Sequence, residues 1–509
     1  MSGKRREAVL AGVDVGTTHC KAVLCTPDGT VLAQAQRRTP ADALGHAHDA
    51  AQLCRAALEA LAACTAAAGR GPDAVGVTGM AETGAPLDAE GAPLLPALSW
   101  SDPRPAVHAE RLRGEYGAAE LHEATGVLPS PKVPLAKWLW LQEEHPDVLR
   151  RMRTWAGAAD LVAHALTGVV GTDATFAQRT MAWDVHAGVW HADLLALAGL
   201  DVDRMPAVHL PGAPVGRIGA ATATALGAVP GAPVVVAGHD HLVGAWAAGV
   251  RTAGESADSM GTAEAVVSLA DAAPDAPATR RQGMSYGRHV DGALWCTVAG
   301  MSSSGALVEW FCDRLLGLAD APLEERYRRF TALVEEAGEG PTGLCVEPYL
   351  YGRSAPAPDP ARRLAIHGLE TGHGLPALAK ALLEGASYQA RWMAEVQGEL
   401  AGAPPHTVTL LGGSVRQRTW AAIKAAVSPW RTLLCDAPDA ACLGAAAWAG
   451  AALGLDPATP VAARRPVDAA SAGADAYQRA YRTVFLPVVT MPATRFPSIA
   501  GPASEEASS

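Results

Sequence analysis

Residues 12–18 read Gly12-Val13-Asp14-Val15-Gly16-Thr17-Thr18, and the apolar run Ala8–Val13 that leads into them predicts a strand. A tight Gly turn frees backbone N–H groups, and the Thr hydroxyls add donors, so such a hairpin is suited to wrap phosphate oxygens. About half a chain later, Asp258-Ser259-Met260-Gly261-Thr262 repeats the Asp and the Gly-Thr pair before a predicted strand, Ala263–Leu269. Two such hairpins facing each other predict a two-lobed clamp for a polyphosphate, and therefore ATP chemistry.

The composition predicts a globular protein with two domains. The chain has 509 residues, which is more than one hydrophobic core normally supports. Its 49% hydrophobic content excludes general disorder. The formal net charge of −11 argues against a nucleic-acid-binding or anionic-membrane-binding surface.

Several features predict a cytoplasmic enzyme. The apolar stretches are interrupted by Asp, His or Gly before they reach the length of a membrane span. The basic start Met1–Arg6 is not followed by a clear cleavage site, so a secretory signal is not expected. The nine cysteines form no C-x-x-C pair and are interpreted as reduced thiols. The sequence does not fix the oligomeric state, and a homodimer is among the assemblies that it allows.

Strands and helices alternate along the chain, which favours an α/β fold. We place the boundary between the domains near Gly249–Gly254, giving domains 1–249 and 250–490 and loose ends at Met1–Arg6 and 491–509. A loop is expected at Thr78–Thr83, with Gly79 near its start. Further predicted strands are Lys21–Leu24, Val31–Ala35, Ala74–Val77, Val234–Ala237, Cys296–Val298, Leu344–Val346 and Thr407–Leu411. Predicted helices are His48–Ala67, Pro134–Gln142, Asp147–Arg153, His241–Ala248, Ala306–Leu316, Leu378–Gln397 and, as the last helix, Ala441–Leu453.

Asp240 is the strongest catalytic candidate. It follows the apolar strand Val234–Ala237 and starts a helix, and ligands of open α/β sheets bind at the carboxyl ends of strands. A carboxylate in that place can accept the proton of an attacking hydroxyl. The alternative is that Asp240 only caps the helix. A metal site in His239-Asp240-His241 is not expected, because adjacent residues do not easily converge on one ion.

Two other motifs have both a functional and an ordinary interpretation. Asp14 is suited to hold Mg²⁺ through water beside the phosphates, or it only stabilises its turn. Gly412-Gly413 follows a strand and would let an adenosine approach the backbone, or it is an ordinary turn. No Walker-type Gly-x-x-x-x-Gly-Lys-Ser/Thr and no Gly-x-Ser-x-Gly elbow in strand–turn–helix context occurs in the chain.

The order of these and further short motifs resembles the FGGY carbohydrate kinase family from Ala8 to Leu486. After residues 12–18 and Lys21, the resembling segments are Gly76–Gly79, Leu87-Asp88, Trp100–Arg104, Lys137–Leu141, Leu166–Gly168, Thr172-Asp173, Ala237–Asp240, Met260–Thr262, Gly352–Pro356, Asp359–Arg362, Glu384-Gly385, Leu411–Gly413 and Leu443–Ala446. Each segment is short, but together and in this order they are specific.

The resemblance implies an ATP-dependent carbohydrate kinase of the two-domain actin/hexokinase/Hsp70-like, ribonuclease H-like fold with an interdomain cleft. It implies that Asp240 is the base that deprotonates a sugar hydroxyl and that Asp14 organises Mg²⁺. The resemblance also implies that the phosphates are lined by Thr17, Thr18, Gly261 and Thr262. It implies that the adenosine is bordered by Gly412 and Gly413.

The segment expected to select the sugar departs from well-known relatives. Met80-Ala81-Glu82-Thr83 stands where xylulose kinases tend to carry Gln-Met-His and glycerol kinases Gln-Arg-Glu-Thr. After the catalytic Asp, this chain has His241 where those two groups tend to carry Asn and Gln. His239 is similar to the residue before the catalytic Asp in deoxyhexulose kinases.

We expect Met80, Ala81, Glu82, Trp100, Asp240 and His241 to contact the sugar. Glu82 either meets sugar hydroxyls or is a solvated loop residue, and Trp100 either stacks on the sugar or fills the core. Glu82 would disfavour an anionic sugar acid unless a nearby Arg offsets it. The expected substrate is therefore a neutral ketose, such as the pentulose xylulose, or a polyol. The alternative function is a catalytically silent regulator that binds sugar or nucleotide on the same fold.

Overall fold

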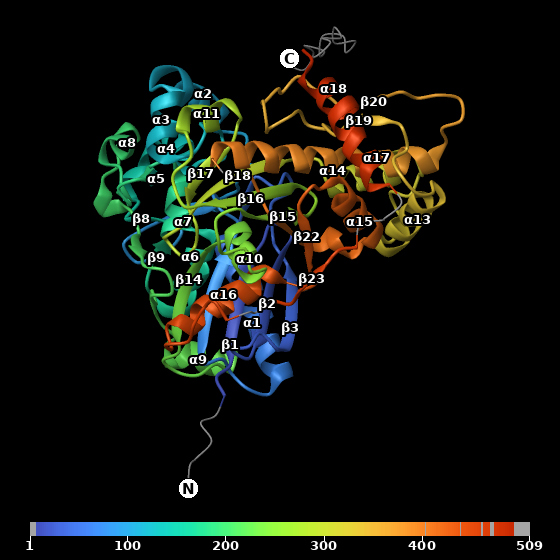
Figure 1. The fold of residues 1–509 in the computed structure, drawn as a ribbon. Coiled ribbons are helices and arrows are strands. Elements are labelled where there is room, and N and C mark those ends of the chain that lie inside the picture. The colour runs from blue at the N-terminus through green and yellow to red at the C-terminus, as the bar shows by residue number, and fades with distance from the viewer. Residues whose placement is uncertain (1–6, 403, 438, 460–461, 469–472, 493–509) are drawn as a thin grey trace, which may run out of the picture.

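The computed structural model describes residues 7–402, 404–437, 439–459, 462–468 and 473–492 (Figure 1). The ends predicted to be loose are Met1–Arg6 and 491–509, and all of these residues except 491 and 492 lie outside the described residues. Two large sheets form the scaffold, one in each half of the chain. Among the described residues, no helix combines the length and the apolar character needed to cross a bilayer.

The first sheet has six strands in the order β13-β14-β5-β1-β2-β3. Strand β2 is antiparallel to both of its neighbours, β1 and the edge strand β3, and β5 and β14 run parallel to β1. Every residue of β14 is buried, which explains its continuous valine run. The bounds are β1 Leu10–Val15, β2 His19–Cys25, β3 Val31–Arg38, β5 Ala74–Gly79, β13 Gly216–Arg217 and β14 Pro233–His239.

The second sheet repeats this plan with seven strands in the order β17-β18-β16-β15-β21-β22-β23. Strands β15, β16 and β18 are antiparallel, and β21 and β22 run parallel to β15. This duplication is the ribonuclease H-like arrangement of the actin/hexokinase/Hsp70 class, as predicted. The bounds are β15 Glu255–Met260, β16 Glu264–Ala270, β17 Ser285–Arg288, β18 Trp295–Met301, β21 Thr407–Leu411, β22 Arg431–Cys435 and β23 Arg464–Pro466.

Smaller sheets and helices surround the two large ones. A four-stranded sheet, β4 Ala47–His48, β7 Ala97–Leu98, β6 Gly84–Leu87 and β8 Thr154–Gly157, adjoins the first. Strand pairs are β9 Gly171–Asp173 with β12 Ala207–His209, β10 Trp183–Asp184 with β11 Val189–Trp190, and β19 Cys345–Glu347 with β20 Ala365–His367. The helices are α1 Ala50–Ala68, α2 Ala106–Glu115, α3 Ala118–Thr125, α4 Pro134–Glu144, α5 Pro146–Arg151, α6 Ala158–Thr167, α7 Ala174–Ala177, α8 Ala192–Leu197, α9 Ala220–Leu226, α10 Asp240–Ala247, α11 Ala276–Arg281, α12 Gly305–Arg314, α13 Leu323–Glu336, α14 Leu375–Leu400, α15 Arg418–Val427, α16 Ala440–Ala451, α17 Ala474–Ala480 and α18 Leu486–Thr490.

Helices α10 and α16 pack against each other between the two sheets (Figure 1). Although α16 comes late in the chain, it lies directly on the first sheet. A Cβ atom on Gly12 would stand 1.7 Å from the carbonyl oxygen of Cys442, and one on Gly76 would stand 1.9 Å from that of Ala445. Glycine is therefore required at both strand positions, because the helix backbone occupies the space of a side chain.

Three local predictions were wrong. Thr78 and Gly79 belong to β5 rather than to a loop, because this strand pairs with β1 along its whole length and with β14 up to Gly79. Helix α5 begins at Pro146 and ends at Arg151, short of the expected Arg153. Two helices, α17 and α18, follow the segment that was expected to be the last helix.

Candidate active site

Asp240 directly follows the carboxyl end of β14 and is the first residue of helix α10. A register shift precedes it, and Gly238 has a φ of 117°, which a side chain rarely adopts. Two hydroxyls hold this bend: Thr78 Oγ1 donates to Gly238 O at 2.5 Å, and His239 N donates to Thr175 Oγ1 at 2.8 Å. The bend presents the carboxylate of Asp240, whose side chain is 26% exposed.

The pKa of Asp240 lies above its ordinary value. Burial is the main cause and Glu82 adds to the rise, whereas His241 opposes it. Oδ1 of Asp240 accepts the backbone N–H of His241 at 2.7 Å, and His239 Nε2 stands 3.2 Å from the same oxygen. Oδ2 has no hydrogen-bond partner among the described residues, so this oxygen is the one left to accept a proton from a bound hydroxyl.

Asp14 lies in β1 and is electrostatically coupled to Asp240. Burial raises the pKa of Asp14 to about 7, Asp240 adds to the rise, and Lys21, its partner across the ladder, opposes it. Asp14 Oδ1 is buried and finds no hydrogen-bond partner in the part of the chain that the structure describes. A carboxylate oxygen of this kind beside a second carboxylate fits a magnesium site, since Mg²⁺ prefers oxygen ligands and would offset the excess negative charge.

The first Gly-Thr turn joins β1 to β2. Gly16 N donates to His19 O at 3.2 Å, and the side chains of Thr17 and Thr18 are exposed. The hydroxyl of Thr17 is already engaged: Trp100 Nε1 donates to it at 2.9 Å, and it donates to Met80 Sδ at 3.8 Å. Thr17 therefore connects the turn predicted to bind phosphate to the predicted sugar segment, whereas the side chain of Thr18 is exposed.

The second turn joins β15 to β16. Gly261 N donates to Ala263 O at 3.0 Å, so this turn closes one residue shorter than the first, and Thr262 is exposed. Gly412 follows β21 with a φ of 99°, and a Cβ there would lie 2.6 Å from Met260 O. A Cβ on the next residue, Gly413, would meet nothing within 4 Å. The predicted adenosine segment thus lies against the second turn. The contact requires glycine at position 412 but not at position 413.

The two Asp residues of the repeated motif do not play equivalent roles. Asp14 precedes Gly16 by two positions, whereas Asp258 precedes Gly261 by three. Because side chains alternate along a strand, Asp258 lies on the opposite face of its strand from Ser259, which occupies the position that matches Asp14. Ser259 Oγ lies 3.3 Å from His241 Nδ1, next to Asp240.

Glu82 is held in a strained turn of the sugar segment. It has a φ of 60°, and its Oε1 accepts from Arg179 Nε at 2.9 Å. Its side chain is 10% exposed, so the alternative of a solvated Glu is wrong. Its carbonyl accepts from Lys137 Nζ at 2.6 Å, and burial lowers the pKa of that Lys to about 7. Since Arg179 pairs with Glu82, the charge argument against a sugar acid no longer holds.

The other predicted sugar residues differ in exposure. Met80 and Ala81 are buried in the core of the first half. Trp100 is half-buried, and Lys132 Nζ lies 5.1 Å from the centroid of its ring. The indole therefore bridges the first turn and a cation rather than filling the core alone.

The His239-Asp240-His241 triplet converges more than its sequence suggested. Potential ligand atoms of all three residues lie within 4.8 Å of one another. We expected that adjacent residues do not easily converge on one ion, yet the rings of His239 and His241 lie at a centroid distance of 5.3 Å.

Sequence reasoning missed Arg179, Lys137 as a support for Glu82, and Ser259. Arg179 is 97 positions from Glu82, and no local pattern marks it as a partner. Ser259 had a signal, because the second motif aligned on its Gly-Thr pair puts it in register with Asp14.

Comparisons with known proteins agree with this geometry. The model of the FGGY family of carbohydrate kinases, N-terminal domain, matches residues 9–247, and the C-terminal domain model matches residues 257–453. The chain is 27% identical to a xylulose kinase of Escherichia coli over 82% of this chain and 84% of that protein. It is 22% identical to a gluconokinase of Bacillus licheniformis over 86% of each.

A solved structure of xylulose kinase from Rhodospirillum rubrum superimposes with a TM-score of 0.81 and 28% identity, over 93% of this chain and 97% of that one. The two family models together cover most of the sequence, on both sides of the junction between the two sheets. The chain therefore belongs to the FGGY family of carbohydrate kinases.

Proposed function

We propose that this kinase transfers the γ-phosphoryl group of ATP to a hydroxyl of a neutral ketose or polyol, with the pentulose xylulose as the first candidate. The observation that carries the proposal is Asp240, a partly exposed carboxylate at a strand end. The backbone holds one of its oxygens, and the other has no hydrogen-bond partner within the described ranges. The xylulose kinases among the relatives support the choice of a ketopentose.

In the proposed reaction, Asp240 Oδ2 takes the proton of the sugar hydroxyl. The sugar oxygen then forms a bond to the γ-phosphorus, and the bond to the bridging oxygen of ADP breaks. Asp14 would hold Mg²⁺ through water, and this ion supplies charge neutralisation for the phosphates. Thr18 and Thr262 offer hydroxyl donors to the phosphate oxygens, and Gly261 lines them without a side chain.

We assign the two halves of the site to the two halves of the chain. Residues 1–249 carry the sugar contacts, the first hairpin and Asp240. Residues 250–490 carry the second hairpin and the adenosine segment Gly412-Gly413. Glu82, held by Arg179, presents its second carboxylate oxygen to sugar hydroxyls, because that oxygen has no hydrogen-bond partner among the described residues.

An ADP-release screen with Mg²⁺ and ATP tests the proposal. Neutral ketoses, aldoses, polyols and sugar acids form the panel, and the sugar acids are essential because Arg179 offsets Glu82. We expect a ketopentose to give the highest kcat/KM. Stimulation by a sugar acid alone would overturn the neutral-acceptor assignment, and ATP binding without any stimulated release would favour a silent regulator.

A further inference from the structure

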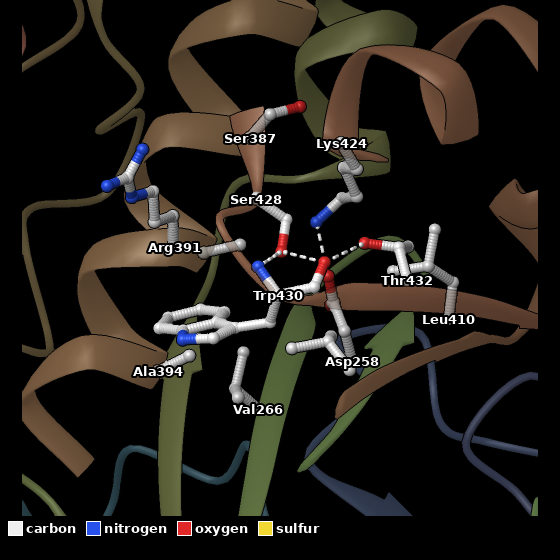
Figure 2. Close-up of a pocket in the computed structure, with 12 residues that line it drawn as sticks. Asp258, Val266, Ser387, Arg391, Ala394, Leu410, Lys424, Ser428, Trp430 and Thr432 are labelled. Atoms are coloured by element: carbon white, nitrogen blue, oxygen red, sulfur yellow. Dashed lines mark hydrogen bonds and ion pairs between the residues drawn. The ribbon is translucent and has the colours of Figure 1, made fainter. Parts of the chain in front are cut away.

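A buried cluster of charged side chains lies behind the second turn and takes no part in the proposed reaction. It consists of Lys424 on α15, Asp258 on β15 and Glu264 at the start of β16. Lys424 Nζ donates to Asp258 Oδ2 at 2.5 Å and to Glu264 Oε1 at 2.7 Å. The three side chains are 4%, 4% and 0% exposed. Asp258 and Lys424 also line a pocket, and Figure 2 shows Lys424 directing its amine towards Asp258 there.

The strand register explains why one lysine reaches both carboxylates. Met260 pairs with Glu264 and Asp258 pairs with Val266, so the two acids lie on the same face of the hairpin. They sit on the two strands immediately before and after the turn that contains Gly261 and Thr262. Lys424 therefore joins both arms of the phosphate hairpin at its base.

The cluster continues to the backbone of the turn through Ser304. Ser304 Oγ donates to Glu264 Oε2 at 2.6 Å, and Ser304 N donates to Thr262 O at 3.2 Å. Gly305 N, at the start of α12, donates to Gly261 O at 2.9 Å. Lys424 itself lies on α15, the helix that follows the predicted adenosine segment. One network thus connects α15, both strands of the hairpin and the carbonyl groups of the turn.

A buried ion cluster is an inefficient way to stabilise a core. Taking charged groups out of water costs several kcal/mol per ion, and well-packed apolar residues often stabilise as much or more. Here two carboxyl groups share a single ammonium, and burial with Asp258 nearby raises the pKa of Glu264 to about 7. The arrangement does, however, fix directions and distances, which is what a phosphate-binding turn requires.

We infer that Lys424 is a positioning residue for ATP: by holding Asp258 and Glu264 it keeps the second turn in the conformation that receives the phosphates. This inference rests on the proposed function, since it assumes that the turn at Gly261 and Thr262 binds ATP. It predicts that breaking the network weakens the use of ATP and leaves sugar binding unchanged.

The test is the triple variant K424M/D258N/E264Q, which removes all three charges together so that no unpaired ion remains in the core. We expect it to bind sugar with wild-type affinity, to show a KM for ATP raised at least tenfold, and to change kcat by less than threefold. The matched control is Lys380→Met, another buried lysine of the second half, whose Nζ donates to Gly340 O at 2.6 Å. This control should leave the KM for ATP unchanged, whatever its effect on Tm.

A triple variant that folds and keeps the KM for ATP within twofold of the wild type would overturn the inference, as would a control that raises this KM equally. If the triple variant does not fold, Glu264→Gln alone decides the question, because it leaves a balanced Lys424–Asp258 pair. It should raise the KM for ATP about threefold without lowering Tm, and an unchanged KM refutes the positioning role. Failure of the proposed function is a separate outcome, since it would appear as wild-type protein that releases no ADP with any sugar.

Discussion

Lys21 Nζ lies 2.7 Å from Asp439 Oδ1, which joins residues 418 positions apart in the chain. Lys21 stands opposite Asp14 in the first hairpin, and Asp439 is the residue before α16. The pair links the first of the two proposed phosphate-binding turns to a helix from the second half of the chain. It also places the positive charge of Lys21 beside the acid that is proposed to hold Mg²⁺.

Lys21→Met should lower kcat/KM for ATP by about tenfold or more. The substitution removes the positive charge that offsets Asp14, and it leaves the carboxylate of Asp439 without this ion pair. Its effect on Tm should be small, since both side chains are partly exposed, at 34% and 18%. Arg37→Met is the control, as Arg37 is an exposed cation of the neighbouring strand β3. Steady-state kinetics at varied ATP checks the prediction, and equal losses in both variants would contradict it.

Gly412→Ala should raise the KM for ATP at least tenfold, because a Cβ there meets Met260 O at 2.6 Å and the φ of 99° disfavours any side chain. Gly413→Ala is a matched control with open space around the added methyl group. Sugar KM should be unchanged in both variants. A Gly413 variant as impaired as the Gly412 variant would show that the contact with the second turn is not the cause.

Arg179→Met should raise the sugar KM strongly, because it leaves the buried carboxylate of Glu82 without its cation. The double variant R179M/E82Q should recover part of this loss, since the amide carries no charge. A double-mutant cycle on sugar KM, with ATP KM as the internal control, measures the coupling. Strictly additive effects would mean that the pair does not act on the sugar as a unit.

Glu384→Gln tests a titrating group far from the reaction. Burial raises the pKa of Glu384 from its ordinary value to about 7, although Thr342 Oγ1 donates to it at 2.7 Å and Tyr477 Oη at 3.2 Å. A carboxyl group with a raised pKa stabilises the fold in full at low pH, and this contribution is lost as the pH rises through 7. The wild type should therefore lose stability relative to the variant between pH 5 and 8, by at most about 1.4 kcal/mol per pH unit.

The free energy of unfolding by denaturant, measured at several pH values in this range, checks the sign. The exposed Glu336→Gln on α13 is the control and should leave the pH dependence as it is in the wild type. A difference between wild type and E384Q that is constant with pH would contradict the raised pKa.

The hairpins and the strand before Asp240 were predictable because each is a local pattern. Val234–Ala237 is apolar throughout, and such a run indicates a strand buried on both faces, as β14 is. Gly-Thr turns between strands likewise need only a few adjacent residues. The packing of α16 on the first sheet was not predictable, because it depends on glycines such as Gly12 that are more than 400 positions away in the chain.

The site was predictable to the extent that its residues follow strand ends. Asp14 and Asp240 were predicted in this way and stay predictions, and the charge of Asp240 contributes to the raised pKa of Asp14. The role of Arg179 was not predicted, because its partner Glu82 is distant in sequence. Asp258 was grouped with Asp14 because both motifs contain an Asp before a Gly-Thr pair. Asp258, however, is one position farther from its glycine, so its side chain lies on the other face of its sheet. Counting spacing from Gly261 would have pointed to Ser259 instead.

ADP release by Asp240→Asn, with ATP, Mg²⁺ and the sugar preferred by the wild type, tests the central claim most directly. Asn keeps the size of the side chain and removes the proton acceptor, so turnover should fall at least a hundredfold while ATP binding, measured by calorimetry, stays close to that of the wild type. Turnover within a few-fold of the wild type would show that Asp240 is not the base.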